Sequence, residues 1–111
     1  GGDAINLLTG EKKPLKEFSG IHFHLVAGIG HPQRFFNTLA EYGIKGEPHA
    51  FPDHHYFQLE DLNFPDQRPV LMTEKDAVKC NAFARESMWY MPVVAKPSES
   101  FISVFQQLIS S

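Results

Sequence analysis

The chain has 111 residues, of which 42% are hydrophobic and 21% charged, and its formal net charge is -3. This length and composition are typical of one globular domain with one continuous core. The charge provides no long-range attraction to nucleic acid or to an anionic membrane surface. No apolar run approaches the roughly 20 residues that cross a bilayer. The single cysteine, Cys80, excludes an intrachain disulfide and fits a reducing compartment.

The first twenty residues differ in pattern from the rest. Two weak apolar pairs flank Thr9-Gly10-Glu11, which is a turn signal. This pattern predicts an arm or short hairpin over residues 1–20, leading into an α/β domain over residues 21–111. The chain begins Gly1-Gly2 without an initiator methionine, so we expect a domain cut from a longer protein.

Alternating residues predict a strand over 21–27, where Ile21, Phe23 and Leu25 alternate with His22 and His24. A helix is predicted over 31–43. Proline at position 32 suits the first helical position, and glycine at position 43 is a plausible stop. Residues 44–51 predict a short, irregular strand at or near a sheet edge, because the proline at position 48 lacks a ladder donor.

The second half of the chain continues the alternation. The pattern predicts a short helix over 57–62, a strand over 68–73, a helix over 74–84 with Thr73 as its cap, and a strand over 89–95. The apolar face of the helix over 74–84 is predicted to contain Ala77, Val78, Ala82 and Phe83. A last helix is predicted over 98–109, with Ser98 as its cap and a buried stripe of Phe101, Val104, Phe105 and Leu108.

Four alternations of strand and helix favour an α/β fold, with a mostly parallel sheet and helices on its faces. In open sheets of this kind, functional groups gather at the carboxyl ends of the strands. The polar segments "AGIGHP", "FPDHH" and "MTEKD" each follow a predicted strand. We therefore expect a site where these three loops meet.

The glycines of "AGIGHP" permit two interpretations. Gly28 and Gly30 would let the backbone approach an anion at the N-terminus of the following helix. A structural turn with positive φ is the favoured alternative, because a lone G-x-G lacks the rest of a dinucleotide fingerprint. His31 is either a cap of this helix or a ligand contact.

The segment "FPDHH" places an acid beside two imidazoles. Pro52 biases the preceding residue toward an extended conformation, so Asp53 should lie at a strand end. From there Asp53 can orient His54 and raise its pKa, as general acid–base sites require. The alternative, which carries equal weight, is that Asp53 caps the next helix while His54 and His55 face solvent.

Other chemistries have weaker support. A metal site would need His22, His24, His54 and His55 to converge with Asp53, but no CxxC or HExxH motif is present and we expect no metal. Lys75 lies at a predicted helix N-terminus, where a phosphate or carboxylate partner would compensate for its charge, whereas the acids at positions 74 and 76 complement the helix dipole. Cys80 is expected to be a small buried residue, and neither a P-loop nor a nucleophile elbow occurs.

Four segments together carry a family resemblance. They are "HLVAGIGHPQRFFNTL", "HAFPDHHYF", "PVLMTEKDAVKC" and "MWYMPV". In this order and at these distances they closely resemble the C-terminal region of the tetraacyldisaccharide 4′-kinases, the lipid A 4′-kinases of Gram-negative bacteria. The resemblance runs from about residue 5 to the end of the chain.

The resemblance implies a smaller lobe of Rossmann-like or P-loop-kinase-like type. It also implies transfer of the γ-phosphoryl group of ATP, with Mg²⁺, to the 4′-hydroxyl of a tetraacyldisaccharide 1-phosphate, a lipid A precursor, at the cytoplasmic face of the inner membrane. The P-loop, the metal-binding acids and a membrane-associating helix would belong to a missing N-terminal domain, the main partner of this chain. The present piece is expected to be soluble, inactive alone and free of bound cofactor.

The resemblance assigns one residue a role. His54 matches a histidine thought to assist a catalytic aspartate of the N-terminal domain, and Asp53 would orient its ring. By location alone, Arg34 and Lys75 are cleft candidates, together with Gly28, Gly30, His31 and His55. Two rival classes remain open, a non-catalytic phosphate- or protein-binding module and a small metalloprotein built on the histidines.

Overall fold

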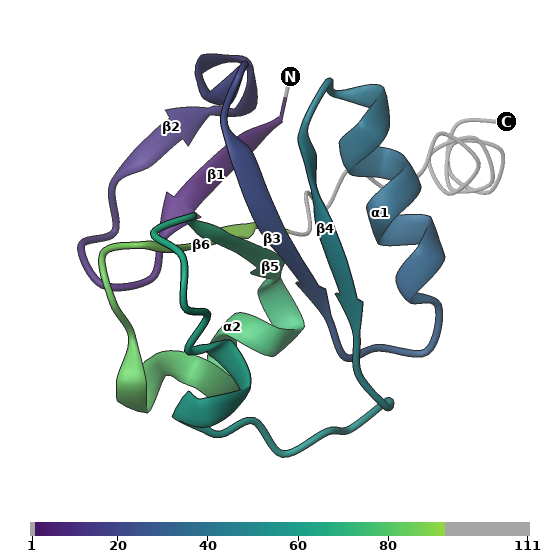
Figure 1. Cartoon of the computed structure of the whole chain (residues 1–111), viewed down its shortest axis with the longest axis vertical. Helices are drawn as coiled ribbons and strands as arrows, with labels where there is room; N and C mark the ends of the chain where they lie inside the picture. Colours follow the sequence, from purple (N-terminus) through teal and green to yellow (C-terminus); the bar gives the residue numbers. More distant parts are fainter. Residues whose placement is uncertain (1, 93–111) are drawn as a thin grey trace, which may run out of the picture.

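The computed structural model describes residues 2–92, which form a six-stranded sheet in the order β2-β1-β6-β5-β3-β4 (Figure 1). The strands are β1 (Asp3–Asn6), β2 (Lys12–Pro14), β3 (His22–Ala27), β4 (Lys45–Ala50), β5 (Val70–Thr73) and β6 (Met88–Met91). The α-helices are α1 (Pro32–Glu41) and α2 (Glu74–Cys80), and the 3-10 helices are η1 (Leu15–Phe18), η2 (Leu59–Leu62) and η3 (Asn81–Phe83).

The sheet is mixed but mostly parallel. Strands β4, β3, β5 and β6 run parallel to one another, whereas β1 pairs antiparallel with both β6 and β2. The prediction of an α/β fold with a mostly parallel sheet is therefore confirmed, while the Rossmann-like class stays a prediction. The first residues form a hairpin that extends the same sheet, and Leu15 and Phe18 of η1 are buried in its core.

The sheet separates two hydrophobic layers, so the expectation of one continuous core is wrong. One layer receives Phe36 and Leu39 from α1, and the other receives Ala77 and Cys80 from α2. Helices therefore pack on both faces, as predicted. Because the central strands are covered on both sides, even a polar residue in the middle of β3 is buried, and His24 is only 3% exposed.

Helix α1 begins and ends where the sequence predicted. Pro32 occupies its first turn, and Gly43 follows its end with a φ of 80°. The Gly43 amide donates to the Ala40 carbonyl and the Ile44 amide to the Leu39 carbonyl, which is the hydrogen-bond pattern of a Schellman motif. Strand β4 lies at the sheet edge, which confirms the prediction made from its proline, although its six-residue pairing with β3 is regular.

Three element predictions need correction. Residues 59–62 form the 3-10 helix η2, where a helix over 57–62 was predicted. Helix α2 ends at Cys80 and continues only as the 3-10 helix η3. The predicted apolar face is therefore right for Ala77 and Phe83, which pack in the core, but wrong for Val78, which is 68% exposed. Strand β6 begins at Met88. The remainder of the predicted strand over 89–95 and the whole predicted helix over 98–109 lie beyond residue 92, outside the described residues.

Within residues 2–92, every helix is too short or too polar to traverse a bilayer.

Candidate functional site at the carboxyl ends of the parallel strands

The polar loops meet at the switch point of the sheet, where the connection after β3 leads to one side and the connection after β5 leads to the other. Strand β3 lies between β4 and β5. The segment after β3 leads to α1 on one face, and the segment after β5 leads to α2 on the other. Because β3, β4 and β5 are parallel, residues 28–31, 51–58 and 73–76 follow strands that end on the same side of the sheet. Ligands bind at this switch point in open α/β sheets.

A buried carboxylate joins two of these loops. Asp76, in the first turn of α2, is 0% exposed. Its Oδ2 accepts a hydrogen bond of 2.8 Å from the Gly28 amide and one of 2.7 Å from the Thr73 hydroxyl. The Thr73 hydroxyl in turn accepts from the Asp76 amide, which confirms Thr73 as the helix cap. The other oxygen, Oδ1, makes no hydrogen bond among the described residues and lies 3.7 Å from the Lys79 ammonium.

The favoured turn interpretation of the two loop glycines is wrong. The glycines with positive φ in the described chain are Gly10, Gly20 and Gly43, so Gly28 and Gly30 do not need glycine for their backbone angles. Space is the reason at Gly28, because an added Cβ would lie 3.1 Å from the Phe57 ring. At Gly30 an added Cβ would lie 3.5 Å from the Asp53 carboxylate, which shows how close the loops after β3 and β4 approach each other.

The segment after β4 turns sharply at the predicted acid–imidazole pair. The His55 amide donates to the Pro52 carbonyl at 3.0 Å, so Asp53 and His54 are the central residues of a β-turn. His54 has a φ of 65°. Its ring is 91% exposed, and its Nε2 lies 3.7 Å from Asp53 Oδ2. The ring is therefore close to Asp53 but makes no hydrogen bond to the described residues.

The backbone of His54 is in a conformation that glycine or asparagine adopts at less cost. A non-glycine residue in this region costs of the order of 1–3 kcal/mol, and such residues concentrate at functional sites. The exposed ring of His54 recovers none of this cost through packing. A histidine at this turn position is therefore explained better by what the ring can do than by how the turn folds.

His55, unlike His54, is held by contacts within the chain. Its Nε2 lies 3.0 Å from Asp61 Oδ2, and its ring packs against those of Phe51 and Phe57. Asp61 also accepts from the Gln58 amide, completing the cap of η2. Asp53 is therefore not the cap of the following helix. The hydrogen bond from the Gln58 amide and the one from His55 hold the pKa of Asp61 below its usual value.

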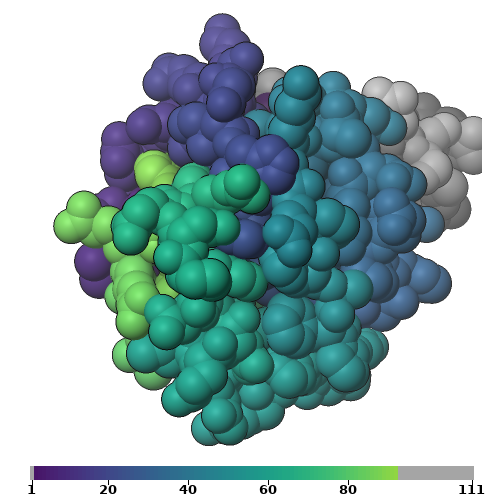
Figure 2. Space-filling view, in the orientation of Figure 1, coloured from purple at the N-terminus to yellow at the C-terminus, as the bar shows by residue number. Residues whose placement is uncertain are grey.

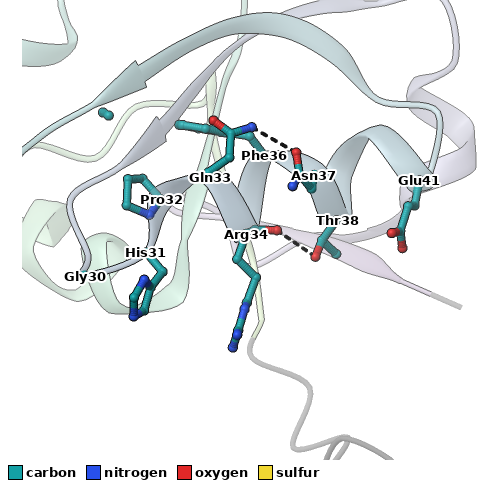
Figure 3. A pocket seen from close by; sticks show the side chains of 10 residues that line it. Gly30, His31, Pro32, Gln33, Arg34, Phe36, Asn37, Thr38 and Glu41 are labelled. Carbon is teal, nitrogen blue, oxygen red and sulfur yellow. Dashed lines mark hydrogen bonds between the residues drawn. The ribbon is translucent and has the colours of Figure 1, made fainter.

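An open groove of about 580 Å³ runs along α1, starting at Gly30 in the loop after β3. Figure 3 shows the side chains of His31 and Arg34 projecting from the first turn of α1 toward the same side. His31 is the N-cap residue but makes no capping hydrogen bond through its side chain. The groove thus presents two nitrogen-bearing side chains beside Gly30, while Glu41 lines its far end.

The remaining predicted residues on α2 lie in contrasting environments. Lys75 is exposed on the first turn of the helix. Cys80 is fully buried, as predicted, and burial together with the nearby Asp76 carboxylate raises the pKa of its thiol to about 12. Cys80 is therefore a neutral packing residue at neutral pH.

The histidines considered as metal ligands do not converge as a set. His22 is exposed at the start of β3, and His54 and His55 belong to the loop after β4. The buried His24 contacts two residues that the sequence analysis missed, with Nδ1 at 2.9 Å from His49 Nε2 and Nε2 at 2.9 Å from Asp66 Oδ1. Burial and the facing His24 ring lower the pKa of His49. The pKa of Asp66 is also lowered. Burial alone would raise it, but the hydrogen bonds from His24 and from the Arg68 amide together have the larger effect.

Asp76 is the other residue whose importance was missed. From the sequence, this carboxylate was expected only to complement the helix dipole. A threonine followed three residues later by an acid is the available signal, because this spacing marks a capped helix start. His49 was signalled by its i, i+2 spacing from Glu47 on a predicted strand next to β3. Neither pattern identifies the partner across the sheet, because that partner depends on strand order.

The fold and the loops define a class, an α/β domain that exposes an acid–imidazole pair at the switch point of a mostly parallel sheet. Residues 2–110 match the family model described as tetraacyldisaccharide-1-P 4′-kinase. The chain belongs to this family.

Three curated relatives show the extent of the similarity, and each is a tetraacyldisaccharide 4′-kinase. The protein from Ruthia magnifica is 51% identical over 88% of the chain, that from Nitrosococcus oceani 50% over 95%, and that from Pseudomonas aeruginosa 51% over 91%. The matched regions cover 31%, 32% and 31% of those proteins, respectively. The chain therefore spans about a third of the length of these relatives. No solved structure matches it.

Replacing Asp76 tests the connection between the loops. Asp76→Ala leaves the buried Gly28 amide without an acceptor, so we expect the free energy of unfolding to fall by about 2–3 kcal/mol. Asp76→Asn retains an oxygen that can accept both bonds and should lose less than half as much. Chemical denaturation gives both values, and Asp53→Ala serves as an exposed control. Equal stabilities of Asp76→Ala and the parent chain would show that the carboxylate does not hold the loops.

Acid should weaken the contact between Asp61 and His55. Because the pKa of Asp61 is lower in the folded state, its stabilising contribution is complete above the unfolded-state value of about 4 and disappears as the pH falls through the folded-state value. The difference in free energy of unfolding between the parent chain and Asp61→Asn should therefore be constant above about pH 5 and shrink as the pH falls below about 4. The exposed neighbour Glu60 provides the control Glu60→Gln. A difference independent of pH would contradict the assignment.

Proposed function

We propose that this chain is the C-terminal part of an enzyme that transfers the γ-phosphoryl group of ATP to the 4′-hydroxyl of a tetraacyldisaccharide 1-phosphate. Family membership supports a kinase, and the relatives carry the name of this activity. The remaining two thirds of the enzyme would bind ATP and Mg²⁺, because the chain itself contains no P-loop sequence. This piece would form one wall of the cleft.

The observation that carries the proposal is the exposed ring of His54 on a backbone conformation unfavourable to it. A side chain that is 91% exposed is accessible to a carboxylate supplied by the rest of the enzyme. His54 would hydrogen-bond that carboxylate and hold it in the orientation and protonation state required of a general base. The carboxylate would take the proton of the 4′-hydroxyl as the sugar oxygen bonds to the γ-phosphorus and ADP leaves.

The neighbouring groups fit supporting roles. Asp53, with Oδ2 at 3.7 Å from His54 Nε2, would restrict the ring without occupying both of its nitrogens. His31 and Arg34 line the groove beside Gly30, where their donors suit phosphate oxygens of either substrate. Lys75 would contribute positive charge near the same end of the sheet. Phosphoryl transfer depends mainly on such positioning and charge stabilisation.

The decisive experiment separates catalysis from folding at His54. In the full-length enzyme, His54→Ala should lower kcat by about 100-fold or more, the usual contribution of an acid–base group. His54→Asn should lower kcat similarly while leaving stability within about 0.5 kcal/mol, because asparagine tolerates a positive φ. Steady-state kinetics and thermal unfolding of the same preparations give both readouts.

The matched control for this experiment is His22→Ala, which removes an exposed imidazole from the start of β3. Its kcat should equal that of the parent enzyme. If His54→Asn retained near-normal turnover, the catalytic role assigned to His54 would have to be given up.

The isolated chain provides a second prediction. If the catalytic carboxylate and the ATP site belong to the remaining two thirds of the enzyme, residues 1–111 alone should neither hydrolyse ATP nor phosphorylate the lipid acceptor. The measurement is a radiolabelled phosphate-transfer assay at matched concentrations of the chain and the full-length enzyme. Turnover by the isolated chain that disappears in His54→Ala would contradict the division of the site between two parts.

A further inference from the structure

A second cluster of polar side chains lies on the α2 face of the sheet, on the neighbouring strands β3 and β4. The parallel register of β3 and β4 places His24 opposite Glu47 and Val26 opposite His49, so Glu47 and His49 share a face with His24. One ligand atom from each of His24, Glu47 and His49 lies within 4.8 Å of the other two. Two imidazoles and a carboxylate are a donor set suited to Zn²⁺.

His24 is oriented as metal-ligating histidines usually are. Both carboxylate oxygens of Asp66 lie 2.9 Å from its Nε2, and the Arg68 amide donates to Asp66 Oδ1 at 3.1 Å. An imidazole that donates its Nε2 hydrogen to a carboxylate has a lone pair on Nδ1. In His24 this lone pair faces His49. A carboxylate behind the ligating ring both orients it and increases its basicity toward a metal.

The distances leave room for an ion after a small adjustment. His24 Nδ1 and His49 Nε2 are 2.9 Å apart, and His49 Nε2 and Glu47 Oε2 are 3.9 Å apart. Tetrahedral zinc with bonds of about 2.0–2.1 Å requires ligand atoms about 3.3 Å from one another, a value between the two. When a neutral His24 donates its Nε2 hydrogen to Asp66, its Nδ1 accepts from His49 Nε2. Moving that hydrogen to Nδ1 of His49 frees the second lone pair.

The surroundings shield the cluster while leaving one approach. The Phe64 ring stacks on His24 with centroids 3.8 Å apart and lies 4.6 Å from the His49 ring. The loop that carries Phe64 and Asp66 lies over β3, beside the edge strand β4 on the face shown in Figure 2. The Glu47 side chain is more than half exposed, so an ion can enter from the sheet edge.

We propose that His24, Glu47 and His49 form a zinc site, with Asp66 as the residue that orients His24. Water would provide the fourth ligand, as it does where the protein supplies three. The ion would fasten the edge strand to β3 and hold the loop over both. His24 lies three residues before the end of β3, about 10 Å at the usual rise per residue, whereas His49 lies one residue before the end of β4. The site does not depend on the proposed kinase activity.

Titration of the untagged 111-residue chain with Zn²⁺ tests the proposal. Calorimetry should show one ion bound per chain, and Co²⁺ should give the visible spectrum of a tetrahedral site. Bound Zn²⁺ should also raise the melting temperature. We expect His49→Gln to weaken Zn²⁺ binding by more than about 10-fold and Asp66→Asn by about 10–100-fold, while Glu47→Gln should cause a smaller loss.

The exposed His22 gives the matched control, because His22→Gln removes an imidazole from the same strand and should leave binding unchanged. His24 is buried, so the decisive variants are His49→Gln and Glu47→Gln, with circular dichroism confirming that they fold. The proposal is overturned if the parent chain binds no Zn²⁺. It is overturned equally if folded His49→Gln binds as tightly as the parent, or if His22→Gln weakens binding as much as His49→Gln does.

Discussion

The hydrogen bond from the Gly28 amide to the buried carboxylate of Asp76 is the constraint on which the site depends. It joins the end of β3 to the start of α2 across the switch point of the sheet. A carboxylate is buried here at high cost unless donors surround it, and the Thr73 hydroxyl, the Gly28 amide and the N-terminus of α2 supply that compensation. With Gly28 held in this way, Phe57 packs directly on it. The loop that ends at Phe57 carries Asp53 and His54, so the position of the exposed ring depends on a bond in the core.

Local chemistry made much of the fold predictable. The start of α1 at Pro32 and its end before Gly43 follow from backbone preferences that act within a few residues. Pro48 placed β4 at the edge because a proline cannot donate to a second neighbouring strand. The meeting of three polar loops followed from a general property of parallel sheets. In each case the cause is contained in a short segment, so a single sequence is sufficient.

The failures share a different cause, because they depend on contacts between distant segments. Gly28 was assigned to a turn with positive φ, yet it is glycine because the Phe57 ring, from another loop, occupies the space of a side chain. The predicted face of α2 assumed a regular helix to residue 84, whereas the helix ends at Cys80. His24 was grouped with the histidines of the loop, but strand order gives it His49 as a neighbour. None of these partners is within reach along the sequence.

The two groups of histidines show how position in the sheet determines what an imidazole can do. In the buried group, Asp66, His24 and His49 contact one another in series, so each of these side chains has a polar partner within the chain. At the rim, His54 has a nearby acid but no hydrogen bond among the described residues, on a backbone conformation that costs energy. A polar group that is costly to hold and has no partner of its own is suited to a partner from outside the chain. The same side chain is thus positioned for internal coordination in one place and for an interface in the other, and this contrast is the physical reason to place a shared active site at the rim.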